Sequence, residues 1–332
     1  MIEIVALSDA MREAVGLAER VAPTDANVLV TGESGAGKDA LAWFIHAHSQ
    51  RASQSLVKID CATLPADLLE AELFGYERGA FTGATEAKPG RLEAAHRGTL
   101  VLDEIAHLTS DAQAKLLRVI ETREFERLGG RKTIEVDARL VALTNADLKS
   151  AVERRAFRDD LFYRLNVVHI IVPPLRERSK DLETLGRVFV QTYAAKHGRP
   201  AKKLSAAALA LLRAYDFPGN VREFGNIIER AVIVSNDAQI AVEDLPEGLR
   251  ASAQQRAQGD RRPTLAEIES QYIREILAAT KGNKAEAARI LGISRKTVQR
   301  HAGRGKTGLA YSPRPPKPMV IDKFRDYIKG CL

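Results

Sequence analysis

The sequence predicts an α/β fold built on a parallel sheet, followed by a helical subdomain and a small all-α domain. Three observations lead to this prediction. Short apolar runs that end in polar residues alternate with helical patterns over the first part of the chain, as in parallel sheets with helical crossovers. After Pro173 and Pro174 the pattern becomes almost wholly amphipathic helix, and a further helical segment follows a polar stretch.

Four apolar runs are the strand candidates. The first lies in NVLVTGESGAGKDALAWFIHAHS, from Asn27, which has the pattern of a strand, a glycine-rich turn and a helix. The others are LVKID at 56–60, GTLVLDEI at 98–105 and RLVALTN at 139–145. In such sheets ligands bind beyond the carboxyl ends of the strands. We therefore expect the polar residues at these ends to gather near the glycine-rich turn: Asp60, Asp103, Glu104 and Asn145.

These patterns divide the chain into consecutive segments. We expect an α/β core over 1–172, a helical lid subdomain over 173–250, a linker over 251–263, a helix-turn-helix domain over 264–302 and a flexible tail over 303–332. The linker ASAQQRAQGDRRP is small, polar and charged, and the tail holds the turn-rich stretches GRGKTG and SPRPPKP. With 332 residues, of which 45% are hydrophobic, the chain is long enough for two or three compact units.

Positive charge is concentrated near the C-terminal end. From Ala251 onward 17 Lys and Arg accompany 7 Asp and Glu, whereas the first 250 residues contain 33 and 36. This pattern favours a nucleic-acid contact confined to the last quarter, with a solvated basic tail as the alternative. Cys61 and Cys331 belong to no CxxC pair or Cys/His cluster, and neither a signal peptide nor a membrane-spanning run is present. We interpret the sequence as having neither, and therefore expect a cytoplasmic protein that does not bind a membrane.

The strongest motif is GESGAGKD, which fits the P-loop pattern GxxxxGK and lies between a strand and a helix. Glycines let backbone N–H groups turn inward around phosphates, the helix N-terminus adds positive potential, and Lys38 reaches the terminal phosphates. We expect every residue of the motif to contribute to nucleotide binding: Gly32, Glu33, Ser34, Gly35, Ala36, Gly37, Lys38 and Asp39. Asp39 stands where Ser or Thr usually supplies a magnesium ligand, so metal binding must depend more on another acid.

Two acids, Asp103 and Glu104, follow the apolar run TLVL and can meet this need. We assign Asp103 to Mg²⁺, held directly or through water, and Glu104 to general-base catalysis or to positioning of the attacking water. Two surface acids at the start of a loop are the alternative interpretation. The motifs together predict ATP and Mg²⁺ as cofactors.

The stretch ELFGYERGAFTGA at 72–84 is not explained by nucleotide binding. It resembles the hallmark loop of the sigma-54-dependent activators, or bacterial enhancer-binding proteins, within the AAA+ ATPases, and the resemblance extends from about residue 10 to 249. In that family the loop rises from the ATPase ring and touches sigma-54. The resemblance implies this role for Gly79, Ala80, Phe81, Thr82, Gly83 and Ala84. Glycines permit a mobile hairpin and an exposed aromatic residue can anchor a partner; a structural turn with a buried Phe81 is the alternative.

The resemblance implies further roles in catalysis. Arg158 and Arg164, in FRDDLFYRL, match the arginine fingers that reach the ATP of a neighbouring subunit. Asn145 matches the sensor of the terminal phosphate, and Arg222, in GNVRE, matches the sensor on the lid.

Asp60 departs from the family pattern. It replaces the Asn often found where the family pairs a side chain with the Walker B glutamate, here Glu104, to switch that glutamate between inactive and active poses. Two facing carboxylates would need a shared proton or a bridging water.

The segment GNKAEAARILGISRKTVQRHA at 282–302 has the spacing of a helix-turn-helix, with a turn at 291–293 and a second helix capped by Ser294. It resembles the Fis-type module of the family, whose second helix enters the major groove. This implies DNA contacts from Ser294, Arg295, Lys296, Thr297, Gln299 and Arg300. An ordinary helical hairpin is the alternative, and GRGKTG ends the second helix earlier than the family pattern suggests.

We interpret the whole as an ATP-dependent activator of transcription by sigma-54 RNA polymerase. A homo-oligomeric ring, a hexamer by family expectation, would hydrolyse ATP at its subunit interfaces and remodel the closed promoter complex, with double-stranded enhancer DNA bound by the C-terminal domain. The alternatives are a DNA-binding regulator without productive hydrolysis and a AAA+ remodeller of an unrelated protein. Because the ATPase pattern begins almost at Met1, we expect no N-terminal regulatory domain and control by a separate protein, by expression level or by unregulated assembly.

Overall fold

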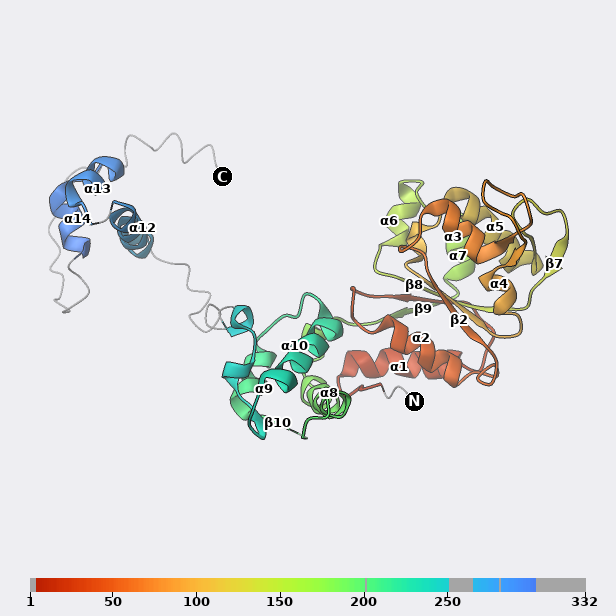
Figure 1. Ribbon diagram of the computed structural model, residues 1–332, viewed down its shortest axis with the longest axis horizontal. Helices are drawn as coiled ribbons and strands as arrows, with labels where there is room; N and C mark the ends of the chain where they lie inside the picture. The colour runs from red at the N-terminus through yellow and green to blue at the C-terminus, as the bar shows by residue number, and fades with distance from the viewer. Residues whose placement is uncertain (1–3, 201, 251–264, 281, 303–332) are drawn as a thin grey trace. The chain divides into compact units, whose positions relative to one another are not determined.

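The computed structural model describes residues 4–200, 202–250, 265–280 and 282–302 (Figure 1). It divides into two compact units, Met1–Ala257 and Gln258–Leu332, and each is described by itself. The predicted linker at 251–263 and the predicted tail at 303–332 lie outside the described residues. Among the described helices, none has the length and apolar character needed to cross a membrane.

A five-stranded parallel sheet lies at the centre of the first unit, in the order β2-β5-β8-β1-β9. The strands are β1 (Val28–Thr31), β2 (Leu56–Asp60), β5 (Thr99–Asp103), β8 (Arg139–Thr144) and β9 (Val168–Ile171). The first four confirm the predicted strands. The edge strand β9 has no counterpart among the predictions, because periodicity alone cannot assign so short an apolar run to a strand or a helix.

Helices cover both faces of the sheet (Figure 1). On one face α1 (Asp9–Val21) and α2 (Lys38–Ala47) pack against Val28 and Val30 of β1. On the other face the core includes Leu29 of β1 together with residues of the helices α3 (Ala66–Phe74), α4 (Arg91–Ala94), α5 (Ser110–Thr122), α6 (Leu148–Glu153) and α7 (Asp159–Leu165). Successive side chains of a strand point to opposite faces, so the continuous apolar runs supply both cores.

Two short antiparallel hairpins project from the core. One joins β3 (Gly75–Tyr76) to β4 (Lys88–Pro89), and the other joins β6 (Glu124–Glu126) to β7 (Thr133–Glu135). The first hairpin carries the hexapeptide GAFTGA at its tip. A 3-10 turn, η1 (Ile105–His107), follows β5.

The lid subdomain follows the core within the first unit. It consists of η2 (Leu175–Glu177), α8 (Leu182–Lys196), α9 (Ala206–Arg213), α10 (Asn220–Val234) and η3 (Val242–Asp244) around its own apolar core. The prediction of an almost wholly helical lid is incomplete, because β10 (Lys203–Leu204) and β11 (Gln239–Ile240) form a short parallel pair. Such two-residue strands arise from tertiary pairing and leave no periodic pattern in the sequence.

The second unit contains α12 (Leu265–Ala279), α13 (Lys284–Leu291) and α14 (Arg295–Ala302) around Ile273, Ala287, Ala288 and Val298. Asn283 caps the start of α13, and Gly292, with a left-handed φ of 65°, caps its end after Leu291. Before α14, the Ser294 hydroxyl accepts a hydrogen bond from the Thr297 backbone N–H at 3.2 Å. These caps place the turn where the sequence predicts it, and the stretch GRGKTG that is expected to end the second helix lies outside the described residues.

Candidate ATP site and partner-binding elements

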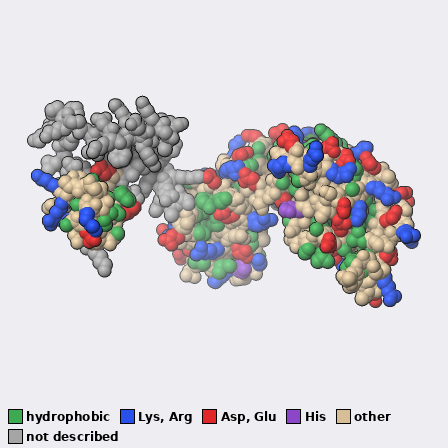
Figure 2. Space-filling view, turned by 90° about the horizontal axis from the view of Figure 1, so that it is seen from above, with side chains coloured by type: hydrophobic (Ala, Val, Ile, Leu, Met, Phe, Trp, Pro, Cys, Tyr) green, Lys and Arg blue, Asp and Glu red, His purple; other side chains and the backbone are tan. Residues whose placement is uncertain are grey.

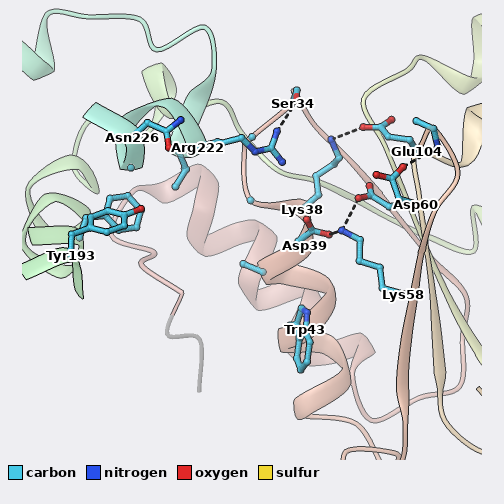
Figure 3. A pocket seen from close by; sticks show the side chains of 18 residues that line it. Ser34, Lys38, Asp39, Trp43, Lys58, Asp60, Glu104, Tyr193, Arg222 and Asn226 are labelled. Carbon is cyan, nitrogen blue, oxygen red and sulfur yellow. Dashed lines mark hydrogen bonds and ion pairs between the residues drawn. The ribbon is translucent and has the colours of Figure 1, made fainter. Parts of the chain in front are cut away.

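A cavity of about 630 Å³ lies between the P-loop, the carboxyl ends of β2 and β5, and the lid helices α8 and α10 (Figure 3). Residues from each of these parts line it, including Lys38, Lys58, Asp103, Tyr193, Arg222 and Asn226. Asp60 and Glu104 line it as well, so three of the four polar residues predicted to gather near the P-loop share one cavity. Asn145, the fourth, contacts this group through its backbone: its N–H donates to Glu104 Oε2 at 3.0 Å.

The P-loop has the close approaches that require its glycines. Gly35 has a φ of +73°, and a Cβ there would come within 2.4 Å of the Gly219 carbonyl oxygen of the lid. Gly37, with a φ of +110°, directly precedes α2. Lys38 is buried, and its Nζ lies 2.9 Å from the Gly32 carbonyl oxygen and 3.5 Å from Glu104 Oε1. An ammonium held over such a loop is suited to terminal phosphates.

Glu104 is oriented by several groups. Its backbone has a left-handed φ of 51°, which is uncommon for a residue with a side chain of this size. Its Oε2 accepts hydrogen bonds from the Asn145 N–H at 3.0 Å and the Thr144 hydroxyl at 3.3 Å, while Oε1 faces Lys38. Thr144 was not among the predicted site residues, because a threonine inside an apolar strand gives no signal beyond strand propensity.

Asp60 and Glu104 have different hydrogen-bond partners. Asp60 Oδ1 accepts from the Ala62 N–H at 2.9 Å, and strand pairing places Asp60 opposite Asp103. The carboxylate pair between Asp60 and Glu104 therefore stays a prediction.

Lys58 bridges two acids next to the P-loop (Figure 3). Its Nζ lies 2.5 Å from Asp39 Oδ1 and 2.7 Å from Asp103 Oδ2. Burial lowers the pKa of Lys58, but hydrogen bonds and charge from Asp103 and Asp39 outweigh it and raise the pKa above its usual value. The ammonium is therefore charged at neutral pH. Lys58 was not among the predicted site residues, because a single lysine in a strand indicates only a solvent-facing position.

The two acids that Lys58 bridges fit a magnesium ion bound together with a nucleotide. Asp39 and Asp103 offer carboxylate oxygens, which are the ligands that Mg²⁺ prefers. Within the described part of the chain, no group of three or more His, Cys, Asp or Glu side chains could hold a metal ion by itself. Mg²⁺ commonly binds through one or two carboxylates together with substrate phosphates, and a pair of acids matches this pattern.

The lid is attached directly to the P-loop. The guanidinium of Arg176 donates two hydrogen bonds to the Glu33 carboxylate, at 2.6 and 2.9 Å, and the buried Asn220 donates a third at 3.0 Å. These bonds, chiefly those of Arg176, lower the pKa of Glu33 from 4.5 to about 2. Arg222 Nη1 lies 3.2 Å from the Ser34 hydroxyl, and its role as the lid sensor stays a prediction. Arg176 and Asn220 were not among the predicted site residues, since only the packing of the lid brings them to Glu33.

Both predicted arginine fingers lie outside the cavity of their own chain. Arg158 directly precedes α7, and its guanidinium binds Asp160 at 2.7 and 3.0 Å. Arg164 pairs with Glu121 at 3.1 Å, and its side chain is 61% exposed. These positions are accessible to a second subunit.

The hexapeptide loop is exposed, and its backbone is closed by its own hydrogen bonds. The Gly79 N–H donates to the Ala84 carbonyl at 2.8 Å, and Gly79 and Gly83 have left-handed φ values of +80° and +106°. The Phe81 side chain is 40% exposed, with one edge packed on Tyr76 at 5.0 Å between ring centroids. The alternative of a buried Phe81 is therefore wrong.

The second hairpin supports the base of this loop. Leu128 exchanges backbone hydrogen bonds with Gly75 and Glu77, at 3.0 and 2.9 Å. Arg127 binds Glu93 at 2.7 and 2.9 Å and Glu77 at 3.1 Å. The sequence did not predict this support, because it depends on strands that are far apart in the chain.

In the second unit the first half of α14 is exposed. Ser294, Arg295, Lys296 and Gln299 are exposed, and Thr297 is half-buried with its hydroxyl 2.9 Å from that of Ser294. The side chain of Arg300 lies outside the described residues. Lys and Arg side chains project from the face of this unit seen in Figure 2. The surface is suited to phosphate and base contacts.

Three known protein families match consecutive parts of the chain. Residues 4–171 match the sigma-54 interaction domain, residues 176–262 the AAA+ ATPase lid domain, and residues 264–301 the Fis family of bacterial regulatory proteins.

Among similar curated proteins, the regulatory protein AtoC of Escherichia coli is 43% identical over 303 residues, which cover 89% of this chain and 66% of AtoC. The transcriptional regulatory protein FlbD of Caulobacter vibrioides is 44% identical over 313 residues, covering 89% and 69% of the two chains. The crystal structure of NtrX from Brucella abortus in complex with ADP has a TM-score of 0.71 and 34% identity, covering 91% of this chain and 68% of NtrX. The chain thus spans about two thirds of the length of these relatives. It belongs to the sigma-54 interaction domain family of AAA+ ATPases, with a AAA+ lid and a Fis-type helix-turn-helix domain.

Proposed function

We propose that this protein is an ATP-driven activator of transcription by sigma-54 RNA polymerase that acts in the cytoplasm. The observation that carries the proposal is an exposed GAFTGA loop on the same compact unit as a P-loop with a well-oriented acid, Glu104. A nucleotide site alone would fit many remodelling enzymes. The loop gives this unit a surface for the sigma factor, and the relatives AtoC and FlbD are named as regulatory proteins.

ATP would bind in the cavity between the P-loop and the lid. The backbone N–H groups of residues 32–39 and Lys38 would hold the phosphates. Arg222 would act as the sensor on the lid. Glu104 would orient the attacking water and accept its proton, because hydrogen bonds from Thr144 and Asn145 fix its carboxylate. Asp103, with Asp39, would hold Mg²⁺, which neutralises charge on the phosphates.

Hydrolysis would require a neighbouring subunit. Arg158 and Arg164 lie on the exposed surface, so we infer that they complete the site of an adjacent copy and stabilise the transition-state charge there. This arrangement implies a homo-oligomeric ring, and a hexamer is the expectation from the family. Asn145, bonded to Glu104, would transmit the state of the terminal phosphate to the catalytic acid.

The two partner surfaces would be separate. Residues 79–84 would contact sigma-54, with Phe81 and Thr82 at the exposed tip. The first turns of α14 would contact double-stranded DNA at enhancer sites, chiefly through Arg295, Lys296 and Gln299.

A mixing experiment tests the shared active site. Glu104→Gln removes the catalytic acid and Arg158→Ala removes the proposed finger, so each variant alone should be inactive in ATP hydrolysis. Mixed in equal amounts they should regain activity, because interfaces with an intact Glu104 on one side and an intact Arg158 on the other will form. Arg154→Ala, which changes another exposed arginine nearby, should behave as the wild type. Failure of the mixture to regain activity would refute the action of Arg158 in trans.

Binding to sigma-54 tests the biological role. Wild-type protein with a transition-state analogue should retain sigma-54, and Phe81→Ala should not, although it should still hydrolyse ATP. No hydrolysis with intact DNA binding would indicate the alternative of a regulator without hydrolysis. Hydrolysis without sigma-54 capture would indicate a remodeller of another protein.

A further inference from the structure

Lys58 lies at a position that a metal ion would be expected to use. It projects from the middle of β2 toward the first turn of α2 and the end of β5 (Figure 3). Its ammonium contacts Asp39 Oδ1 at 2.5 Å and Asp103 Oδ2 at 2.7 Å, so a single cation joins the two acids that are best placed for Mg²⁺. An ammonium has three donors and can serve both carboxylates at once.

The burial of Asp103 distinguishes its half of this bridge from an ordinary surface ion pair. The Asp103 side chain is only 16% exposed, whereas the side chains of Lys58 and Asp39 are 37% and 46% exposed. All three face the cavity that also holds Lys38 and Glu104. A carboxylate in such a setting needs a cation, since an uncompensated buried charge is costly.

The lysine and a metal ion would compete for the same oxygens. Mg²⁺ and Mn²⁺ bind through carboxylate oxygens, and the ammonium of Lys58 already engages one oxygen of each acid. A divalent ion that binds without a nucleotide must displace this ammonium and gains no phosphate ligands in return. An ion that arrives with ATP brings phosphate ligands of its own, and the phosphates offer the displaced ammonium a new partner.

We propose that Lys58 keeps divalent cations out of the metal site while no nucleotide is bound. Its ammonium neutralises Asp39 and Asp103, and it is displaced only when a metal ion binds together with the nucleotide. The inference rests on the proposed ATP site. It assigns to Lys58 a positioning role, because Lys58 acts on the metal through the two acids that it holds.

The test measures Mn²⁺ binding to the full chain without nucleotide, by the loss of the electron paramagnetic resonance signal of free Mn²⁺. Lys58→Met removes the competing charge and should tighten Mn²⁺ binding at one site by at least about tenfold. Lys58→Arg keeps the charge and should bind Mn²⁺ as weakly as the wild type. Lys180→Met is the matched control, since Lys180 pairs with an exposed acid, Asp9, at 3.1 Å, away from the cavity.

A second substitution locates the gained site. Adding Asp39→Asn to Lys58→Met should remove the gain, because one of the two carboxylates is lost. Equal Mn²⁺ affinity in the wild type and Lys58→Met would overturn the proposal, and so would a gain that persists without Asp39. If Lys58→Met does not fold, Lys58→Gln asks the same question with a polar side chain.

A separate measurement distinguishes failure of the ATP site from failure of this inference. Trp43, the single tryptophan of the chain, lines the same cavity, so energy transfer from it to a fluorescent ATP analogue reports nucleotide binding. Absence of analogue binding in the wild type would refute the proposed ATP site. Normal analogue binding, together with Mn²⁺ affinities that do not depend on Lys58, would refute only the role of Lys58.

Discussion

Replacing Asn220 by alanine should weaken the attachment of the lid to the P-loop and lower the stability of the first unit. The Asn220 side chain is fully buried, and its Oδ1 accepts a hydrogen bond from the Leu175 N–H at 2.8 Å. Its Nδ2 donates to Glu33 Oε2 and to the Ser34 carbonyl, both at 3.0 Å. One amide therefore joins η2, α10 and the P-loop, and its backbone has a left-handed φ of 52°.

The magnitude follows from these contacts. Alanine leaves the buried Leu175 N–H without its partner, which costs about 1–3 kcal/mol. Alanine also tolerates the left-handed backbone less well than Asn, at a cost of about 1 kcal/mol. Asn220→Ala should therefore reduce the free energy of unfolding by about 3 kcal/mol, which is large for a single substitution. Because the same side chain holds Ser34 and Glu33, ATP should also bind more weakly.

Urea unfolding of the full chain provides the assay. The fluorescence of Trp43, in α2, reports the first unit without a signal from another tryptophan. Asn236→Ala is the control, because Asn236 is exposed and should change the free energy by no more than about 0.5 kcal/mol. If Asn220→Ala were as mild as this control, the argument that Asn220 anchors the lid would be refuted.

Three further predictions concern Glu33, Thr144 and Cys61. Because hydrogen bonds, chiefly from Arg176, lower the pKa of Glu33 from 4.5 to about 2, their stabilisation is complete above about pH 4.5 and is lost as the pH falls toward 2. The difference in unfolding free energy between the wild type and Glu33→Gln should shrink over that interval; a difference independent of pH would contradict this. Thr144→Val removes the hydroxyl bond to Glu104 and should slow hydrolysis by about tenfold with unchanged affinity for the ATP analogue. An equal loss of affinity would assign Thr144 to binding. Burial first, and then nearby acids, raise the pKa of Cys61 to about 12, so mass spectrometry should find it unmodified by iodoacetamide in the folded protein and modified after unfolding. Rapid modification under native conditions would show that the site opens.

Much of the fold could be predicted from the sequence because its signals are local. The runs at β1, β5 and β8 are apolar over most of their length, as buried parallel strands require, whereas β2 carries Lys58 and Asp60 among its apolar residues. The glycines of GESGAGKD, the acids that follow TLVL and the cap at Ser294 depend on turn and strand-end chemistry between neighbouring residues. The edge strand β9 and the pair β10–β11 escaped prediction, since a few half-exposed residues leave no periodic pattern.

Only the tertiary structure decided which side chains meet. Lys58 reaches Asp39 and Asp103 because β2 pairs with β5 and α2 begins beside their carboxyl ends. Asn220 reaches the P-loop, 186 residues earlier in the chain at Ser34, only because the lid folds back onto it. By itself the sequence determined most of the elements, the P-loop and the GAFTGA motif, but not the exposure of Phe81. The contacts between them depend on strand order and lid packing, and these are properties of the whole chain that no short stretch of residues encodes.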